Sequence, residues 1–308
     1  FDTFAIDCGQ AYFEKFMHAG KYDYVLNLSA MKHVRSENSA FSMHRMFETN
    51  VLNVVRTHQW ARDSGVLKYF CVSSDKAANP ANYMGATKRA MELCLMLENL
   101  DIPISGARFA NVAFSNGSLM DSFRYRISKK QPLSIPVDID RYFITQEESG
   151  IICILSALLC QTNEILFPHN EDEINLTNFK SVAENFLNTL GKTPIFIPDE
   201  LEAKCAMSSL DIDKYWPVNI FKSDTVGEKP FEEFFTENES VFAENFRDLA
   251  SVKFTSPYTK SMVDTFLQDF QKIKPFNFGA REKMIELVED FVPTFAHTGG
   301  SKFLNERM

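Results

Sequence analysis

Short apolar segments alternate with helix-like segments through the first 170 residues, and this alternation constrains the fold more than any other feature of the sequence. Four of the segments are rich in Val, Ile, Phe and Tyr, as strands are: residues 1–7, 22–30, 67–74 and 102–110. Strands that are apolar throughout are typical of a parallel sheet with helices on each face. The alternation therefore predicts an α/β chain with a doubly wound parallel sheet.

Apolar residues at helical spacing mark the longer connections between these strands. They predict helices within residues 38–64 and 82–99. The second half of the chain is less regular and has no clear strand after about residue 206. The elements predicted there are strands at 163–168 and 193–198 and helices at 179–191 and 281–292.

The composition excludes several classes of protein. With 308 residues, 45% of them hydrophobic, and a net charge of −9, the chain is of globular type and offers no basic stripe for nucleic acid. Its longest mostly apolar stretch, residues 150–160, is shorter than the ~20 residues that a membrane-spanning helix needs. No signal peptide is visible, and the six scattered cysteines have no metal-binding spacing. We therefore expect a cytoplasmic protein with reduced thiols, no membrane span and no bound metal.

Residues 73–89, SSDKAANPANYMGATKR, place charged side chains where a ligand site is expected. In open parallel sheets, ligands bind beyond the carboxyl ends of the strands, and Asp75 and Lys76 directly follow the third predicted strand. Lys88 lies on the next helix, with Met84 one turn before it on the same face. Taken singly, an Asp-Lys pair is usually solvated, a helix Lys is usually a surface charge, and Met usually fills a core. Their combined spacing favours a site.

The same segment resembles the active-site region of a known superfamily. A Ser or Thr at a strand end, followed by a helix with Tyr-x-x-x-Lys, is the layout of the extended short-chain dehydrogenases/reductases. Within it, residues 73–89 are similar to the CapD-like polysaccharide-biosynthesis group of UDP-N-acetylglucosamine 4,6-dehydratases, which carry Ser/Thr-Asp-Lys-Ala, Asn-Pro and Met-Gly-Ala-Thr-Lys-Arg in this order. The resemblance extends to residues 26–34, 48–54, 107–118, 140–145, 223–239 and 297–308. It implies a Rossmann-like fold with a smaller C-terminal substrate-binding region.

The resemblance divides the chain into a dinucleotide-binding domain, residues 1–165, and a substrate-binding region with a C-terminal extension, residues 166–308. Residues 1–7 resemble the third strand of the fold, with Asp7 where the family's acid meets the adenine. The glycines form no Gly-rich phosphate-binding turn, so the first two strands and the pyrophosphate-binding loop are lacking in this sequence. We expect them in residues upstream of Phe1.

A second departure concerns the Tyr of the superfamily pattern. Met84 stands in its place, and Tyr83, one position earlier, lies ~100° around the helix from the face of Lys88. In the group that the chain resembles, configuration-retaining dehydratases carry Met at this position and inverting ones keep Tyr. Met84 therefore favours the retaining branch.

The resemblance implies a redox cycle in which tightly bound NAD, or NADP, takes hydride from carbon 4 of the sugar and later returns it to carbon 6. Between these steps water is eliminated across carbons 5 and 6, which needs an acid and a base. We assign Asp75 as the acid and Lys76 as the base, provided that the site holds Asp75 protonated and Lys76 neutral. Lys88 is expected to bind the nicotinamide ribose, and Ser74 to relay the proton of the 4-hydroxyl.

Further binding residues follow from the resemblance alone. Those expected at the cofactor are Asp7, Ser29, Ala30, Lys32, Asn50 and Lys88. Those expected at the UDP-sugar are Lys32, His33, Met84, Asn111 and Arg141. Arg141 suits a diphosphate because a guanidinium binds two oxygens at once, but a surface ion pair explains it equally well. Asn50 is equally well explained as a polar residue inside a helix.

The sequence thus favours a configuration-retaining UDP-N-acetylglucosamine 4,6-dehydratase that serves surface polysaccharide or nonulosonic acid synthesis, as a homo-oligomer. A nucleotide-sugar epimerase of the same superfamily is an alternative, but it needs no acid and base for elimination and normally keeps the Tyr. A truncated, non-catalytic relative that acts as a partner subunit is a second alternative. The joint presence of Ser74, Asp75, Lys76 and Lys88 counts against it.

Overall fold

The computed structural model describes residues 2–32, 37–98, 101–169, 176–222, 232–295 and 297, which belong to two compact units. The larger unit contains Phe1–Phe109, Gly150–Glu171 and Glu233–Met308, and the smaller unit contains Ala110–Ser149 and Asp172–Glu232. The chain thus leaves the larger unit twice and returns to it twice. This division differs from the predicted one between residues 165 and 166, because strands from the C-terminal part pair with the central sheet of the larger unit.

The larger unit is built on a six-stranded sheet with the order β1-β2-β3-β8-β13-β12. Its parallel strands are β1 (Tyr24–Asn27), β2 (Lys68–Ser74), β3 (Ile104–Phe109) and β8 (Glu164–Pro168), and its antiparallel strands are β13 (Leu249–Lys253) and β12 (Ser240–Phe242). Each of the parallel strands lies within a segment that the sequence predicts as a strand. The predicted α/β fold with a mainly parallel sheet is confirmed.

The first predicted strand is the exception. Residues 2–7 form no strand, and β1 is an edge strand that pairs only with β2 among the described residues. An extended segment needs hydrogen-bonded neighbours to become a stable strand, and within the described part of the chain residues 2–7 have no such ladder. The Asp7 carboxylate accepts a hydrogen bond from the Gly9 N–H at 2.8 Å and pairs with the Arg45 guanidinium at 3.5 Å. Its contact with an adenine stays a prediction.

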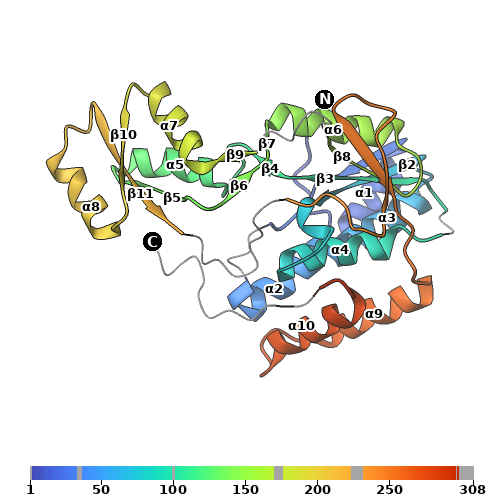
Figure 1. The fold of residues 1–308 in the computed structure, drawn as a ribbon. Helices are drawn as coiled ribbons and strands as arrows, with labels where there is room; N and C mark the ends of the chain where they lie inside the picture. Colours follow the sequence, from blue (N-terminus) through green and yellow to red (C-terminus); the bar gives the residue numbers. More distant parts are fainter. Residues whose placement is uncertain are drawn as a thin grey trace. The chain divides into compact units, whose positions relative to one another are not determined.

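Helices cover both faces of this sheet (Figure 1). The larger unit holds the helices α1 (Ala11–Gly20), α2 (Ala40–Phe47), α3 (Asn53–Asp63), α4 (Tyr83–Leu95), α6 (Gln146–Leu159), α9 (Lys260–Lys272) and α10 (Ala280–Phe291). Successive residues of a strand point to opposite faces, and Lys68 and Tyr69 are neighbours on β2. The Lys68 amine donates to the Ser156 carbonyl of α6, and the Tyr69 hydroxyl donates to the Val54 carbonyl of α3. The sheet is therefore doubly wound, as predicted.

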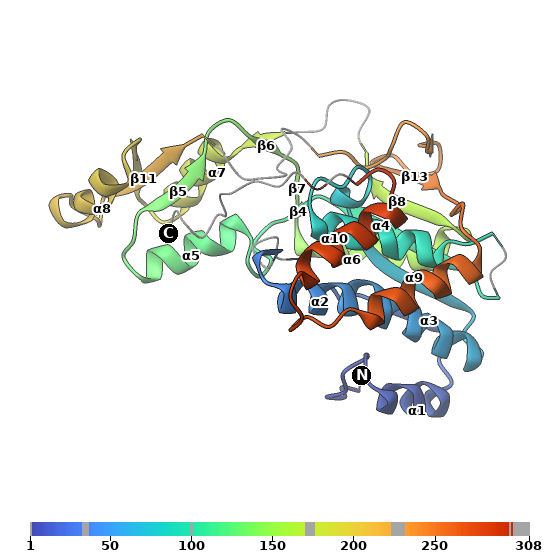
Figure 2. The same cartoon turned by 90° about the horizontal axis from the view of Figure 1, so that it is seen from below.

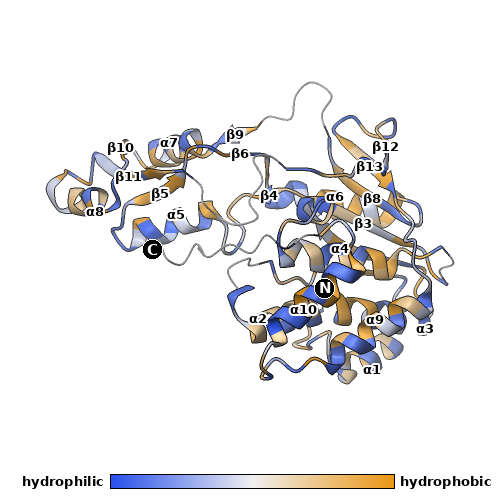
Figure 3. Cartoon of the chain, turned by 60° about the horizontal axis from the view of Figure 1, so that its bottom comes forward, coloured by the Kyte–Doolittle hydropathy of each residue, from blue (hydrophilic) through white to orange (hydrophobic). Residues whose placement is uncertain are grey.

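The helix α4 is buried along its whole length. One side faces the sheet, and α10 packs on the other, as the view from below shows (Figure 2). Aromatic rings hold this covering layer together: Phe266 of α9 stacks on Phe291 of α10 at 3.7 Å, and Phe270 stacks on Phe47 of α2 at 3.6 Å. The helices α9 and α10 each have a hydrophobic and a hydrophilic side (Figure 3). The helix α9 lies outside the elements that the sequence predicts.

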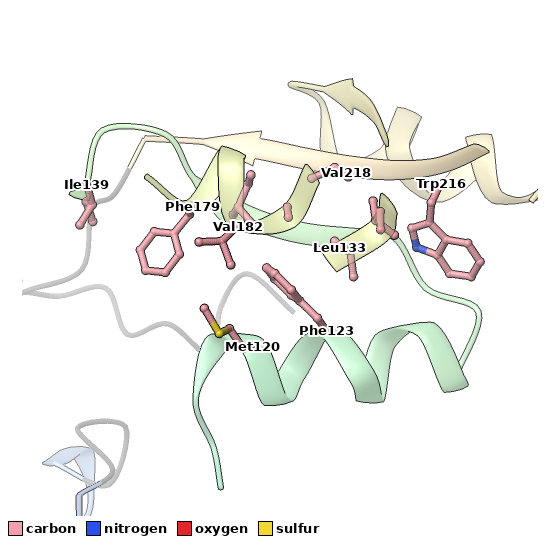
Figure 4. Packing of buried hydrophobic residues seen from close by; sticks show 11 residues of the cluster. Met120, Phe123, Leu133, Ile139, Phe179, Val182, Trp216 and Val218 are labelled. Atoms are coloured by element: carbon pink, nitrogen blue, oxygen red, sulfur yellow. The ribbon is translucent and has the colours of Figure 1, made fainter. Parts of the chain in front are cut away.

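The smaller unit contains a three-stranded parallel sheet with the order β10-β11-β5. Its elements include β5 (Leu133–Pro136), β10 (Thr193–Ile197), β11 (Tyr215–Phe221), α5 (Leu119–Ser128), α7 (Phe179–Thr189) and α8 (Glu200–Ser209). Phe123 of α5, Val182 of α7 and Val218 of β11 lie together in its core (Figure 4). The sequence does not predict β11, because Pro217 cannot donate to a ladder and counts against a central strand.

Candidate active site

The predicted catalytic residues Ser74, Asp75 and Lys76 form one hydrogen-bonded group at the end of β2. Asp75 and Lys76 lie in a 3-10 turn, Asp75–Ala77, which explains how neighbouring side chains can touch. The Ser74 hydroxyl donates to Asp75 Oδ1 at 2.6 Å and accepts from the Lys76 N–H at 3.2 Å. Lys76 Nζ lies 3.1 Å from Asp75 Oδ2. The turn therefore brings a carboxyl group and an amine, which can serve as acid and base, into direct contact.

This pair lies at the boundary between the interior and the solvent. The Asp75 side chain is 5% exposed, and that of Lys76 is 38% exposed. Lys76 is therefore the more accessible member of the pair.

A glycine at the start of α4 lets the helix pack directly on the turn. The Asn82 side chain caps α4 by accepting from the Gly85 N–H at 2.8 Å. A Cβ added at Gly85 would lie 2.5 Å from the backbone oxygen of Lys76, closer than such atoms can approach. The Gly of the Met-Gly-Ala-Thr-Lys segment thus has a structural reason, because it sets the distance between α4 and the Asp75–Ala77 turn.

Lys88 is buried on α4, with 3% of its surface exposed. Its Nζ donates to the Val72 carbonyl of β2 at 2.9 Å, and it makes no hydrogen bond to Asp75 or Lys76 in the described structure. Burial lowers the pKa of Lys88 to about 8, although the nearby Cys71 and Glu92 act in the opposite direction. Lys88 therefore contacts β2, the strand that ends at the Asp75–Lys76 pair, but its hydrogen-bond partner is the Val72 carbonyl and not a member of the pair.

The lowered pKa of Lys88 predicts a pH dependence of stability that a K88M variant isolates. Between pH 8 and 10.5 the unfolded chain binds a proton at Lys88 that the folded protein has lost, so folding becomes more favourable as the pH rises. Relative to K88M, the free energy of unfolding of the wild-type protein should rise by roughly 3 kcal/mol across this window. Urea denaturation of both proteins at pH 7.5 and 10 measures it. A constant difference between the two proteins would contradict the shift.

Met84 and Tyr83, four and five positions before Lys88, are both buried. Met84 is 4% exposed, and its backbone N–H donates to the Glu37 carboxylate at 3.0 Å. Tyr83 is fully buried, and its hydroxyl has no hydrogen-bond partner in the described part of the chain. Burial and the nearby Glu37 raise the pKa of Tyr83. Tyr83 is therefore poorly suited to replace the superfamily Tyr as an acid or base.

Asn50 lies in a π-helical turn, Glu48–Leu52, that joins α2 to α3. Its amide donates to the Met31 carbonyl and to the Thr87 hydroxyl, both at 2.9 Å, and its oxygen accepts from the Met31 N–H at 2.8 Å. Asn50 therefore ties the loop after β1 to α4 at the residue before Lys88. The predicted contact with the cofactor stays a prediction.

The other predicted cofactor residues of the larger unit follow β1. The Ser29 hydroxyl donates to the Asn27 side chain at 2.8 Å, while Ala30 and Lys32 are exposed in the loop. His33 lies outside the described residues. Since β1 and β2 are parallel neighbours, this loop and the Asp75–Ala77 turn lie at the same edge of the sheet, where ligands of such folds bind.

Asn111 and Arg141, predicted at the substrate, lie in the smaller unit on two short ladders. Asn111 belongs to β4 (Asn111–Val112), paired with β7 (Phe143–Ile144), and Arg141 belongs to β6 (Asp140–Arg141), paired with β9 (Thr177–Asn178). Both side chains meet the Glu232 carboxylate: the Asn111 amide at 2.5 Å and Arg141 Nε at 3.4 Å from the same oxygen. The structure thus brings the two predicted residues together through an acid that the sequence did not single out.

A buried network of two Arg and two Glu residues lies beneath the end of β2. Arg108, fully buried on β3, contacts Glu92 and Glu239 at 2.8 Å each, and Arg89 contacts the same two carboxylates at 3.0 and 2.8 Å. Burial alone would raise the pKa of Glu239, but Arg108 lowers it to about 2. Ser73, next to the candidate site, donates to Glu92 at 2.6 Å. The network therefore fixes the strand end that carries the site.

The described residues hold no group of three or more His, Cys, Asp or Glu side chains that could bind a metal ion. None of their helices is both long enough and apolar enough to cross a membrane.

Comparison with known proteins then places the chain. Residues 8–253 match the family described as polysaccharide biosynthesis protein. The chain belongs to this family. It is 26% identical over 267 residues to the capsular polysaccharide biosynthesis protein CapD of Staphylococcus aureus, covering 85% of this chain and 39% of that protein. The resemblance inferred from residues 73–89 is confirmed.

Two further likenesses bear on this chain. It is 30% identical over 142 residues to an inverting UDP-N-acetylglucosamine 4,6-dehydratase of Campylobacter jejuni, covering 44% of this chain and 41% of that protein. The chain thus spans about two fifths of the length of these curated relatives. A solved structure, Pen from Bacillus thuringiensis, shares the fold with a TM-score of 0.63 and 19% identity, covering 86% of this chain and 81% of that one.

Two acids of the structure, Glu232 and Glu239, were not predicted from the sequence. Both lie in the acidic run of residues 232–239, which the resemblance includes but to which it gives no role. Their partners are 121 and 131 residues away in the chain. The acidic character of this run could have drawn attention to these residues. The sequence alone, however, does not distinguish buried carboxylates from solvated ones.

Proposed function

We propose that the protein is a configuration-retaining nucleotide-sugar 4,6-dehydratase that converts UDP-N-acetylglucosamine to the 4-keto-6-deoxy sugar, in surface polysaccharide or nonulosonic acid synthesis. The observation that carries this proposal is the 3.1 Å contact between Asp75 and Lys76 at the end of β2. Elimination needs an acid and a base, and the contact supplies one of each. The name of the Campylobacter relative supports 4,6-dehydration, and the name of the Staphylococcus relative supports a role in polysaccharide synthesis.

The Asp75–Lys76 pair can reach its working protonation state in one step. When a proton moves from Lys76 Nζ to Asp75 Oδ2, the ion pair becomes a neutral amine and a neutral acid. The two groups are in direct contact, so this transfer needs no other residue. Lys76 then takes the proton of carbon 5, the bond between carbon 6 and its oxygen breaks, and Asp75 protonates the departing hydroxyl to give water. The pair ends in its starting ionic form.

The cofactor proposed is NAD or NADP, tightly bound and recycled in each turnover. The edge of β1 and β2 suits the nicotinamide end of such a group, because hydroxyls at Ser29 and Ser74, an amine at Lys88 and the exposed loop after β1 belong to these strands and the helix packed on them. When bound, the cofactor supplies the reversible hydride transfer. In the proposed site Lys88 holds the ribose and Ser74 relays the proton of the 4-hydroxyl.

Incubation of the full-length protein with UDP-N-acetylglucosamine and NAD tests the proposal by mass spectrometry. A product lighter by one water, with a keto group at carbon 4, is expected. An isomer of unchanged mass would instead indicate an epimerase. Absence of turnover together with absence of bound cofactor would indicate a non-catalytic partner subunit. We also propose that the enzyme works in the cytoplasm as a homo-oligomer, which fractionation and light scattering test.

A further inference from the structure

The carboxylate of Glu37, a residue between β1 and α2, lies at the start of α4. Glu37 is 4% exposed. Its Oε1 accepts a hydrogen bond from the Met84 backbone N–H at 3.0 Å, and its carboxylate also accepts from the Tyr83 backbone N–H. The first N–H groups of a helix have no partner within the helix, and an ionised carboxylate is favoured there by the helix dipole. Glu37 therefore caps α4 from a distant part of the chain.

The next two N–H groups of α4 are satisfied by Asn82. Its side chain accepts from the Gly85 N–H at 2.8 Å, and its carbonyl accepts from the Ala86 N–H at 3.0 Å. The first four N–H groups of the helix thus all have partners. Glu37 and Asn82 together fix the position of the first turn of α4.

This first turn of α4 packs directly on the candidate active site. The backbone oxygen of Lys76 lies so close to Gly85 that an added Cβ would meet it at 2.5 Å. Closely packed groups transmit small displacements to one another. A shift of the helix start therefore moves the turn Asp75–Ala77, in which the acid and the base lie.

The fold holds Glu37 in its ionised form at a cost. Burial raises the pKa of Glu37 and has the largest effect, while the Met84 and Tyr83 N–H groups and the Arg281 guanidinium of α10 lower it. Arg281 Nε also donates to the Glu37 backbone carbonyl at 3.0 Å. The Tyr83 hydroxyl stays neutral, because burial and Glu37 raise its pKa. A perturbed carboxyl group that is kept despite its cost is typical of functional sites.

We propose that Glu37 is a positioning residue whose ionised carboxylate holds the start of α4 against the turn that carries Asp75 and Lys76, and that proton uptake by Glu37 loosens this contact. The inference rests on the proposed function, because it gives the contact a role in the elimination of water. Glu37 itself touches neither member of the pair among its described contacts. It acts through the first turn of α4.

The variant E37Q tests this inference by removing the charge while keeping the size of the side chain. The Gln oxygen can accept from one of the two N–H groups, but its NH2 group cannot accept from the other. We expect kcat for dehydration of UDP-N-acetylglucosamine to fall about 10–100-fold at pH 8. The ratio of the wild-type kcat to the E37Q kcat should approach one as the pH falls, because protonated Glu37 is also neutral. A ratio that does not change with pH would overturn the inference.

Urea denaturation separates positioning from a general loss of folded protein. Between pH 4.5 and the raised pKa of Glu37, the folded protein holds a proton that the unfolded chain has lost. The urea midpoint of the wild-type protein should therefore fall relative to that of E37Q as the pH rises through this window. Over the same window the wild-type protein should gain activity relative to E37Q. Activity and stability that rise together would show a structural role alone.

The variant E282Q is the matched control. Glu282 lies 3.8 Å from the same Arg281 guanidinium, but its side chain is 62% exposed on α10. E282Q makes the same chemical change and should retain the wild-type kcat at every pH. An equal loss in E282Q and E37Q would assign the effect to the charge of Arg281 and would overturn the role given to Glu37.

A measurement on the wild-type protein tests the contact without a variant of Glu37 and without turnover. The backbone amide proton of Met84, assigned with M84L in protein labelled with 15N-methionine, should change its chemical shift with pH as Glu37 titrates. An amide that does not titrate between pH 4.5 and 8 would overturn the inference whatever the activity. A wild-type protein that shows this titration but forms no dehydrated product would overturn the proposed function and leave Glu37 as the cap of α4 alone.

Discussion

Replacing Asp75 by Asn should slow the elimination of water by about 10²–10⁴-fold while the protein stays folded. The amide has the shape of the carboxyl group but cannot give up a proton to the departing hydroxyl. It also cannot take the proton of Lys76, whose amine lies 3.1 Å from the carboxylate. Initial rates at saturating UDP-N-acetylglucosamine, followed by mass spectrometry, measure the effect.

The variant D101N is the matched control for this result. It makes the same chemical change at an exposed aspartate that pairs with Arg62 on the surface. Exposed pairs of this kind contribute little, so D101N should retain the wild-type rate. A D75N protein that turns over as fast as D101N would show that Asp75 is not the acid.

Replacing Arg108 by Met should lower the free energy of unfolding by about 3–5 kcal/mol, the largest stability effect expected for the chain. Arg108 is fully buried and is the shared partner of Glu92 and Glu239. Methionine would fill much of the same volume but leave Arg89 as the one guanidinium, among the described residues, that the two buried carboxylates share. Urea denaturation at pH 7 measures the loss.

Two further variants separate the network from general effects of losing an arginine. R62M removes an Arg from surface ion pairs and should change stability by less than about 1 kcal/mol. Adding E92Q to R108M removes one of the unbalanced charges and should recover part of the loss. Equal destabilisation by R108M and R62M would contradict the role given to the network.

The sequence predicts well what local patterns encode. The strands β1, β2 and β3 and the helix α4 follow from apolar periodicity, which is a property of each segment by itself. Residues 2–7 have the same composition but no strand, because strand formation depends on neighbours that periodicity does not show. The strand β11 was missed for the opposite reason: Pro217 is unfavourable locally but is accommodated by packing in the sheet.

The site shows the same limit. Ser74, Asp75 and Lys76 are consecutive, so a motif could identify them together, and the 3-10 turn makes them touch. Glu232 and Asn111 are 121 residues apart and meet only through the fold of the smaller unit. Burial of Lys88 and of the Arg108 network likewise depends on tertiary packing. The sequence shows that these residues are charged, but it does not show that their side chains are buried.

The packing of α10 on α4 also limits where two copies of the protein can contact each other. With every residue of α4 already buried, a second subunit cannot dock on that helix while α9 and α10 stay in place. The connection between these two helices instead presents the rings of Phe276 and Phe278 to solvent, 73% and 103% exposed. This connection lies after residue 253, where the family match ends. Changes in this C-terminal hairpin therefore need not alter β2 or the turn after it, which carries Asp75 and Lys76.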